Sequence, residues 1–427
     1  MFTPAELAAE HARAMRIVKA VLAACDARAA TACAARAEGF AAGDALWVLA
    51  IGKAAIGMAE GIKDVCGDPH RHLIVTVDGP PALSLANILR SDHPLPTQRS
   101  VDAGRGVKRF IQEARAAVAP SLTVLMSGGA SSLICEPIPG LELEDYRGVV
   151  GAMLAGGWEV QRMNAVRRAI DGLKGGRLSA LAAPLPVDLV VISDVIGDTL
   201  CDIGSGPFVH SPTGASVAAD LIERAFDDRH AAVLTALSCQ PSPPRVTAPR
   251  RTVVALNNAG AVRAAGDVLR AEGLSVVSDD WDVTAFMTGV GESAGLALSA
   301  ATPREALTWG GEWDLAAPAS GFGGRAQAAA VSLAQSLAVP VVGFVVATDG
   351  VDGLAPPGEA PAAGAIVWTG MHWPDEADED EDWLAANSFA RLARRDAGRP
   401  KGEPAAHLQL GATGVNVNDL LVAWRVK

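Results

Sequence analysis

The chain has 427 residues, of which 50% are hydrophobic and 20% charged, and its 36 Lys and Arg against 48 Asp and Glu give a net charge of −12. This composition excludes a disordered chain, and an acidic chain without a basic block is a poor nucleic-acid or anionic-membrane binder. Six scattered cysteines, none in a C-x-x-C pair, exclude a disulfide framework and indicate a reducing compartment. With no signal peptide and no apolar run of ~18 residues, we expect a soluble, cytoplasmic α/β protein.

The predicted elements begin with a helix. Thr3, Pro4 and Glu6 provide an N-cap, an N1 proline and the acid of a capping box. Helical patterns then alternate with short apolar runs, which predict buried strands at 45–51, 73–77, 122–126 and 187–192. Such alternation predicts a mainly parallel sheet, whose ligands bind beyond the carboxyl ends of the strands.

A proline-rich stretch at 239–245 predicts a domain boundary, because proline ends the preceding helix. A second set of strands is predicted at 251–256, 274–277, 305–309 and 340–347. We therefore expect one domain over residues 1–240 and another over 250–427. The acidic run 374–382 lacks the glycine and the ligand spacing of a calcium loop, and we expect a solvated loop there.

Two predicted strands of the first domain are followed by loops suited to anions. Ser127-Gly-Gly-Ala-Ser-Ser132 follows strand 122–126, and its glycines would let a phosphate or carboxylate approach the backbone. Lys53 follows strand 45–51 and is a candidate counterion for phosphate. A plain tight turn and a solvated lysine are the alternatives. The spacing of a P-loop is absent.

Further candidates lie at other predicted strand ends and helix starts. Asp194 and Asp198 follow strand 187–192 and could bind Mg²⁺ or act as a general base, although a capping role is an alternative. Arg325 opens a helix after a glycine-rich segment, where it could bind phosphate with both arms of its guanidinium. A cationic group formed by Arg167, Arg168, Lys174 and Arg177 is either functional or an ordinary exposed helix face.

A dinucleotide-binding pattern, G-x-G-x-x-A, matches at 289–294 and again at 321–326. The first match has no clear strand before it, and the second is followed by its first carboxylate only at Asp349, on a later predicted strand. The structural context that a dinucleotide site requires is therefore missing, which disfavours NAD binding.

Motifs along nearly the whole chain, in order, resemble the glycerate 2-kinase family, which has often been labelled hydroxypyruvate reductase. They are AIGKAAIGMAEG (50–61), SDHPLP (91–96), MSGGASSL (126–133), MNAVRRAIDGLKGGRLS (163–179), SDVIGD (193–198) and GSGPFV (204–209). The segments GGE (310–312), GFGGRAQ (321–327), ATDGVDG (347–353) and GATGVNVNDLLV (411–422) resemble its C-terminal MOFRL domain.

The resemblance implies two α/β domains with mainly parallel sheets, a larger Rossmann-like N-terminal domain and an active site in the interdomain cleft. It implies ATP-dependent phosphorylation of D-glycerate to 2-phospho-D-glycerate with Mg²⁺, in serine and glyoxylate metabolism. The family's lysine, aspartate and arginine correspond here to Lys53, Asp194 and Arg325. With these we expect phosphate binding by Ser127, Gly128, Gly129, Ser131, Lys174, Gly323 and Gly324, substrate binding by Asn164 and Arg167, and metal binding by Asp194, Asp198 and Asp349.

The sequence departs from the family pattern at two places. Alanine stands at 326 and 328, where the family usually has Asn and Glu, and Trp313 and Asp314 stand in place of two threonines. The exact substrate therefore stays open, with a hydroxypyruvate reductase, a diverged sugar-acid kinase or a metabolite-binding relative as alternatives. We expect a small-molecule substrate and no nucleic-acid or membrane partner. A homodimer is considered as the oligomeric state.

Overall fold

A computed structural model describes residues 2–40, 46–79, 86–211, 215–225, 231–239, 246, 248–280, 287–313, 321–373 and 381–427. The chain divides into two compact units. The central unit comprises Ala27–Ala255, and the terminal unit comprises Met1–Asp26 together with Leu256–Lys427.

The two units differ from the predicted domains at both ends of the predicted N-terminal domain, residues 1–240. Helix α1 (Pro4–Ala24) begins with the predicted capping box, since Thr3 Oγ1 accepts from the Glu6 N–H and Glu6 accepts from the Thr3 N–H. This helix belongs to the terminal unit, where it packs on α11 (Asn258–Ala271) and β9 (Val341–Ala347). Strand β6 (Arg251–Leu256), predicted in the second domain, instead joins the first sheet. The proline-rich stretch at 239–245, which precedes β6, lies outside the described residues apart from Cys239.

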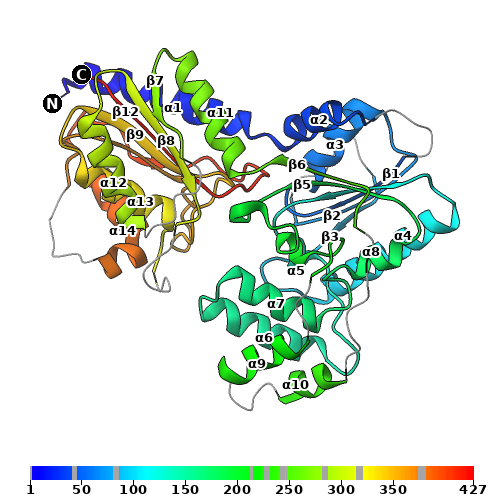
Figure 1. The fold of residues 1–427 in the computed structure, drawn as a ribbon. Helices are drawn as coiled ribbons and strands as arrows, with labels where there is room; N and C mark the ends of the chain where they lie inside the picture. Colours follow the sequence, from blue (N-terminus) through cyan, green and yellow to red (C-terminus); the bar gives the residue numbers. More distant parts are fainter. Residues whose placement is uncertain are drawn as a thin grey trace. The chain divides into compact units, whose positions relative to one another are not determined.

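The sheet of the central unit has the order β3-β2-β1-β4-β5-β6, and the pairs from β3 to β5 are parallel, as predicted. Its other strands are β1 (Trp47–Ile51), β2 (Arg71–Thr76), β3 (Ile88–Arg90), β4 (Leu122–Met126) and β5 (Val187–Ile192). Helices cover both faces (Figure 1): α2 (Ala27–Ala37) and α3 (Ala55–Cys66) on one, α4 (Gln98–Ala116) and α8 (Arg177–Ala182) on the other. Strands β1 and β4 are buried along their whole length, as strands covered on both faces must be.

A group of four helices forms a second core inside the central unit (Figure 1). Tyr146, Val149 and Val166 belong to this core and are all almost completely buried. The helices are α6 (Leu143–Ala155), α7 (Val160–Ile170), α9 (Ala215–Ala225) and α10 (Ala231–Ser238).

The sheet of the terminal unit is mixed, which corrects the prediction of a second mainly parallel sheet. Its order is β11-β10-β9-β12-β8-β7; only the β7–β8 pair is parallel, and the other four pairs are antiparallel. The strands besides β9 are β7 (Ser275–Ser278), β8 (Glu305–Gly311), β10 (Gly364–Trp368), β11 (His407–Leu408) and β12 (Asp419–Arg425). The C-terminal strand β12 inserts between β8 and β9 and runs against both, because the chain reaches it from the other end of the sheet.

Helices α12 (Met287–Ala300), α13 (Arg325–Ser336) and α14 (Glu381–Gly398) gather on one side of this sheet (Figure 1). The first G-x-G-x-x-A match lies inside α12, where glycine allows close helix packing. A Cβ atom at Gly291 would lie 2.5 Å from the Leu333 N atom of α13, and one at Gly295 would lie 2.7 Å from Ser336 Cβ. Close packing therefore explains Gly291 of the match and the nearby Gly295, whereas a Cβ atom at Gly289, the first glycine of the match, would meet nothing within 4 Å.

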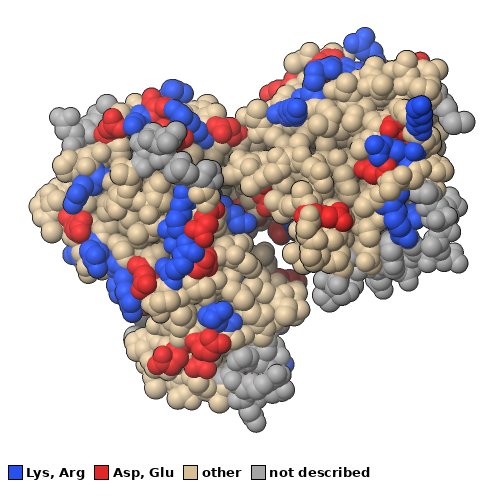
Figure 2. Space-filling view, turned by 180° about the vertical axis from the view of Figure 1, so that it is seen from behind, with Lys and Arg blue, Asp and Glu red and all other residues tan. Residues whose placement is uncertain are grey.

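Charged side chains of both signs cover the surface in view. On the face shown in Figure 2, basic and acidic side chains are interspersed, and neither sign forms an extended patch. No described helix is both long and apolar enough to cross a bilayer. Residues 374–380 of the acidic run lie outside the described residues, so the predicted solvated loop stays a prediction.

Candidate active site

The loops that follow β1 and β4 lie against each other. The Lys53 N–H donates to the Gly128 carbonyl oxygen (2.9 Å), and the Ala54 N–H donates to Ser127 Oγ (3.0 Å). A Cβ atom at Gly52 would lie only 2.1 Å from Ser127 Oγ. Ser127 is 2% exposed and its hydroxyl joins the two loops. Ser127 thus has a structural role, and its predicted phosphate binding stays a prediction.

The two glycines after Ser127 let functional side chains approach the loop. Gly129 has a φ of +87°, and a Cβ atom there would lie 3.2 Å from both Lys53 Cγ and His93 Cδ2. A Cβ atom at Gly128 would lie 2.1 Å from Asp194 Oδ2. The structure thus brings together Lys53 and Asp194, which are 141 positions apart in the chain, at one glycine loop.

Two cations near this loop form no ion pair with the described residues. Within the part of the chain that the structure describes, the side chains of Lys53 and Arg167 make no hydrogen bond or ion pair, and both are partly exposed. The pKa of His93 falls to about 4, because surrounding protein displaces water from part of the ring and because Lys53 and Arg167 repel a further positive charge. His93 is therefore neutral at pH 7. Two available cations beside a glycine loop suit an anionic ligand.

His93 was not among the residues expected to act at the site. Its only signal in the sequence was its place in the SDHPLP motif. Because the residue lies on a loop after β3, chain distance alone could not place it beside Lys53.

A buried polar network stands behind Ser131. Ser131 Oγ lies 2.9 Å from Ser205 Oγ, and Ser205 donates its hydrogen to Asn164 Oδ1 (2.7 Å). Ser131 must then donate to Ser205, so its own hydrogen is not available to a phosphate. Asn164 is 1% exposed and also donates to the Asp202 carbonyl oxygen (3.0 Å). These contacts correct Ser131 from phosphate binding and Asn164 from substrate binding to support of the loop.

Lys174 is also corrected, because its side chain is completely buried. Its ammonium forms an ion pair with Asp171 and donates to the Ile134 carbonyl oxygen (2.9 Å). Asp171 is equally buried and accepts from the Tyr146 hydroxyl (2.8 Å). A lysine enclosed in this way cannot reach a phosphate in the site.

Replacing Lys174 by methionine should therefore lower stability, with any loss of activity following from that. Removing the cation leaves the Asp171 charge buried, which costs ~3–5 kcal/mol in the free energy of unfolding. Lys108→Met is the matched control, because Lys108 pairs with Glu136 at a half-exposed position and should cost less than ~1 kcal/mol. Chemical denaturation of both variants measures the difference. A Lys174→Met protein of unchanged stability that no longer binds ATP would restore the phosphate assignment.

In the terminal unit, Arg325 is held by two carboxylates. Its Nη1 atom lies 3.0 Å from Glu312 Oε1, after β8, and its Nε atom lies 3.3 Å from Asp419 Oδ2, at the start of β12. The charge of Asp419, more than that of Glu312, raises the pKa of Arg325 above its ordinary value. The Arg325 side chain keeps 31% of its surface exposed. It is a fixed cation that an incoming anion can still reach.

The start of α13 is closed by Asp352 and is not an open phosphate site. The Asp352 carboxylate accepts from the N–H groups of Ala326 (3.1 Å) and Gln327 (2.7 Å), and burial raises its pKa to about 6. A Cβ atom at Gly324 would lie 2.2 Å from Asp352 Oδ1, while one at Gly323 would lie 2.1 Å from Ser388 Oγ. Both glycines therefore allow close packing, and their predicted phosphate binding stays a prediction.

The predicted metal ligands do not form a ready-made centre. Asp194 and Asp198 lie on the loop after β5 in the central unit, whereas Asp349 lies after β9, where its carboxylate accepts from the Val351 N–H (3.0 Å). Among the described residues, no three His, Cys, Asp or Glu side chains are grouped so that they could hold a metal ion. The metal assignment stays a prediction.

The departures from the family pattern lie in the packed interior. Ala326 and Ala328 are fully buried in α13, and Trp313 is fully buried as well. Within the described part of the chain, Trp313 Nε1 has no hydrogen-bond partner. Asp314 lies outside the described residues. Three of the four departures are thus buried in the terminal unit.

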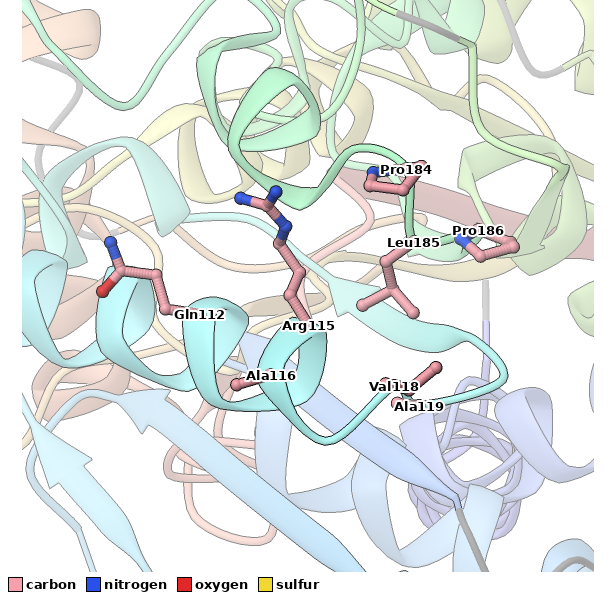
Figure 3. A pocket seen from close by; sticks show the side chains of 8 residues that line it. All are labelled: Gln112, Arg115, Ala116, Val118, Ala119, Pro184, Leu185 and Pro186. Carbon is pink, nitrogen blue, oxygen red and sulfur yellow. The ribbon is translucent and has the colours of Figure 1, made fainter.

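A separate cavity of about 510 Å³ lies at the other end of the central sheet (Figure 3). Arg115, Val118 and Leu185 are among its lining residues, next to the first residues of β4 and β5. None of the predicted site residues lines it. Its position at the amino ends of the strands separates it from the glycine loop, which follows the carboxyl end of β4.

Comparison with known proteins agrees with this arrangement of motifs. A family model described as a domain of unknown function (DUF4147) matches residues 7–238, and the MOFRL family model matches residues 305–419. A D-glycerate 2-kinase of Thermotoga maritima is 26% identical over 395 residues, covering 89% of this chain and 90% of that enzyme. The chain belongs to the glycerate 2-kinase family.

Other members of the glycerate 2-kinase family extend the likeness. An Agrobacterium vitis protein with the provisional name hydroxypyruvate reductase is 31% identical over 406 residues, covering 87% of this chain and 85% of that protein. The crystal structure of a Thermotoga maritima glycerate kinase has a TM-score of 0.79 at 26% identity and covers 97% of this chain and 98% of its own. The Pyrococcus horikoshii protein PH0495 shares the fold with a TM-score of 0.71 at 24% identity, covering 97% of this chain and 98% of its own.

Proposed function

We propose that this protein transfers the terminal phosphoryl group of ATP to the 2-hydroxyl of D-glycerate, giving 2-phospho-D-glycerate and ADP. The observation that carries the proposal is the pair of cations, Lys53 and Arg167, which form no ion pair among the described residues and both act on His93 beside the Gly128–Gly129 loop. Both substrates are anions, and phosphoryl transfer depends mainly on positioning and on stabilising negative charge. Family membership and the kinase names of similar proteins support the same reaction.

Asp194 is the proposed base. Its carboxylate lies against Gly128, on the loop that also contacts Lys53. As the bond between the 2-hydroxyl oxygen and the γ-phosphorus forms, the bond from that phosphorus to the β–γ bridging oxygen breaks. The hydroxyl proton passes to Asp194. Lys53 and Arg167 then hold the glycerate carboxylate or the phosphoryl oxygens.

Arg325 is the proposed ligand of the transferred phosphoryl group in the terminal unit. Its guanidinium offers parallel N–H donors, which match two phosphate oxygens better than a point charge does. Mg²⁺ enters with ATP, and carboxylates such as Asp194 or Asp198 are the ligand type it takes in addition to phosphate oxygens. Bound there, the ion would neutralise charge on the phosphates.

Hydroxypyruvate reduction is the second candidate, and it rests on the names carried by some relatives. The structure offers it little support. One G-x-G-x-x-A match is internal to α12, and at the other Asp352 occupies the N–H groups of Ala326 and Gln327.

Purified protein should form ADP only when D-glycerate, ATP and Mg²⁺ are all present, with 2-phosphoglycerate as the second product. Coupled ADP detection and phosphorus NMR of the product measure both. A parallel reaction with NADH and hydroxypyruvate serves as the control. We expect no NADH oxidation there, because an anion-binding site does not by itself bind a dinucleotide. NADH oxidation without any glycerate-dependent ADP would overturn the kinase proposal.

A further inference from the structure

Asp419 occupies a central place in the terminal sheet. As the first residue of β12 it is paired on one side with Gly311 of β8 and on the other with Ala347 of β9. It is therefore adjacent to the ends of the two strands that lead into the GGE and ATDGVDG motifs. Only 1% of its surface is exposed.

The carboxylate of Asp419 is unusually placed for a buried group. Its Oδ2 atom accepts no hydrogen bond from the described residues and lies 3.3 Å from Arg325 Nε. Three further carboxylates, Asp352, Glu312 and Asp349, repel it. A buried charge of this kind destabilises a fold unless it is well paired, so folding alone does not explain it. Among the described residues, its one cationic partner is Arg325.

Among the described residues, the contacts of Arg325 involve only two of its three guanidinium nitrogens. Nε is next to Asp419 and Nη1 is bound to Glu312, whereas Nη2 has no partner among the described residues. With the side chain 31% exposed, Nη2 can meet an incoming oxygen. Holding two corners of a planar group fixes the direction of the third.

We propose that Asp419 is a positioning residue, which fixes the orientation of Arg325 toward the phosphoryl group that is transferred. The proposal rests on the kinase function proposed above. Asp419 itself need not touch either substrate, and its effect passes through Arg325. A displacement of ~1 Å in a group that positions reacting atoms can cost ~10²-fold in rate.

Burial raises the pKa of Asp419 to about 7, and the charges of Asp352, Glu312 and Asp349 act in the same direction, against Arg325. Because this value is above the ordinary 3.8, the contribution of Asp419 to stability is fully present below about pH 4. It is lost as the pH rises through about 7. At pH 8 the charged Asp419 therefore destabilises the fold, and its removal should stabilise it.

The test is a double-mutant cycle with Asp419→Asn and Arg325→Lys, in which kcat, KM and the melting temperature are measured at pH 8. We expect Asp419→Asn to lower kcat by ~10²-fold with little change in the KM for glycerate, and to keep or raise the melting temperature. In the Arg325→Lys protein, Asp419→Asn should have little further effect on kcat, because the guanidinium that Asp419 would orient is already absent. Asp188→Asn is the matched control, since Asp188 is a buried strand carboxylate paired with Arg250 in the central unit.

Asp419→Glu keeps the charge and should recover part of the lost kcat, which a residue needed only for packing would not do. Equal losses of kcat from Asp419→Asn in both backgrounds, or unchanged kcat, would overturn the proposal. If Asp419→Asn does not fold, the pH profile of the unsubstituted protein decides. A kcat that falls as the pH drops through about 7 supports the proposal, and a flat kcat from pH 8 to pH 6 contradicts it. An unsubstituted protein without glycerate-dependent ADP formation would instead refute the proposed function.

Discussion

Arg325→Ala is expected to abolish measurable turnover. The side chain is fixed by Glu312 and Asp419 and keeps an exposed edge, so that it can bind negative charge as this charge develops on the phosphoryl group. Arginines in such a role contribute ~10³-fold or more to kcat. Arg325→Lys should also be poor, because an ammonium cannot contact two carboxylates and a phosphate in one plane.

Steady-state kinetics with ATP and D-glycerate measure both losses. Arg270→Ala is the matched control, because Arg270 lies in the same unit, at the end of α11, and pairs with Asp267 at an exposed position. This control should retain full activity. Turnover of Arg325→Ala near that of the unsubstituted protein would remove the arginine from the mechanism.

Lys53→Ala is expected to lower turnover by ~10²-fold or more while the protein remains folded. The lysine has no ion pair among the described residues, so its removal leaves no buried charge without a partner. His93 cannot replace it, since a pKa of about 4 keeps the ring neutral at pH 7. Arg167 remains as a single cation near the loop, which should preserve weak substrate binding.

Lys63→Ala provides the control, because Lys63 lies on helix α3, which follows Lys53, and pairs with the exposed Asp68. Melting temperatures of both variants should match that of the unsubstituted protein. The Lys53 assignment fails if the folded Lys53→Ala protein turns over D-glycerate as fast as the Lys63→Ala control does.

Local signals in the sequence were sufficient for several elements. The capping box at Thr3 and Glu6 predicted the start of α1, because both contacts lie within one helical turn. The apolar runs predicted β1, β2, β4 and β5, and the order of strands and helices predicted their parallel pairing. The meeting of the Lys53 loop with the glycine loop followed from that pairing.

The mixed sheet of the terminal unit could not be predicted in the same way. An apolar run such as the one in β12 indicates burial but carries no information about which strands flank it or in which direction they run. Strand β12 pairs with β8 and β9, whose residues are more than 70 positions away in the chain. For the same reason the sequence did not single out Asp419 as a site residue. Its distance to Arg325 in the structure makes it a candidate for positioning that arginine.

Lys53 and Lys174 show what the sequence determines and what only the tertiary structure decides. The sequence by itself determined which residue types follow each strand, and so it identified Lys53, Asp194 and Arg325 as candidates. Only the tertiary structure decided that Lys174 is enclosed with Asp171, whereas Lys53 has no ion pair in the described part of the chain. The physical reason is that local pattern sets which elements form, whereas burial and the choice of partner depend on packing between elements distant in the chain. The same amino acid can therefore be a structural ion pair in one place and an anion ligand in another.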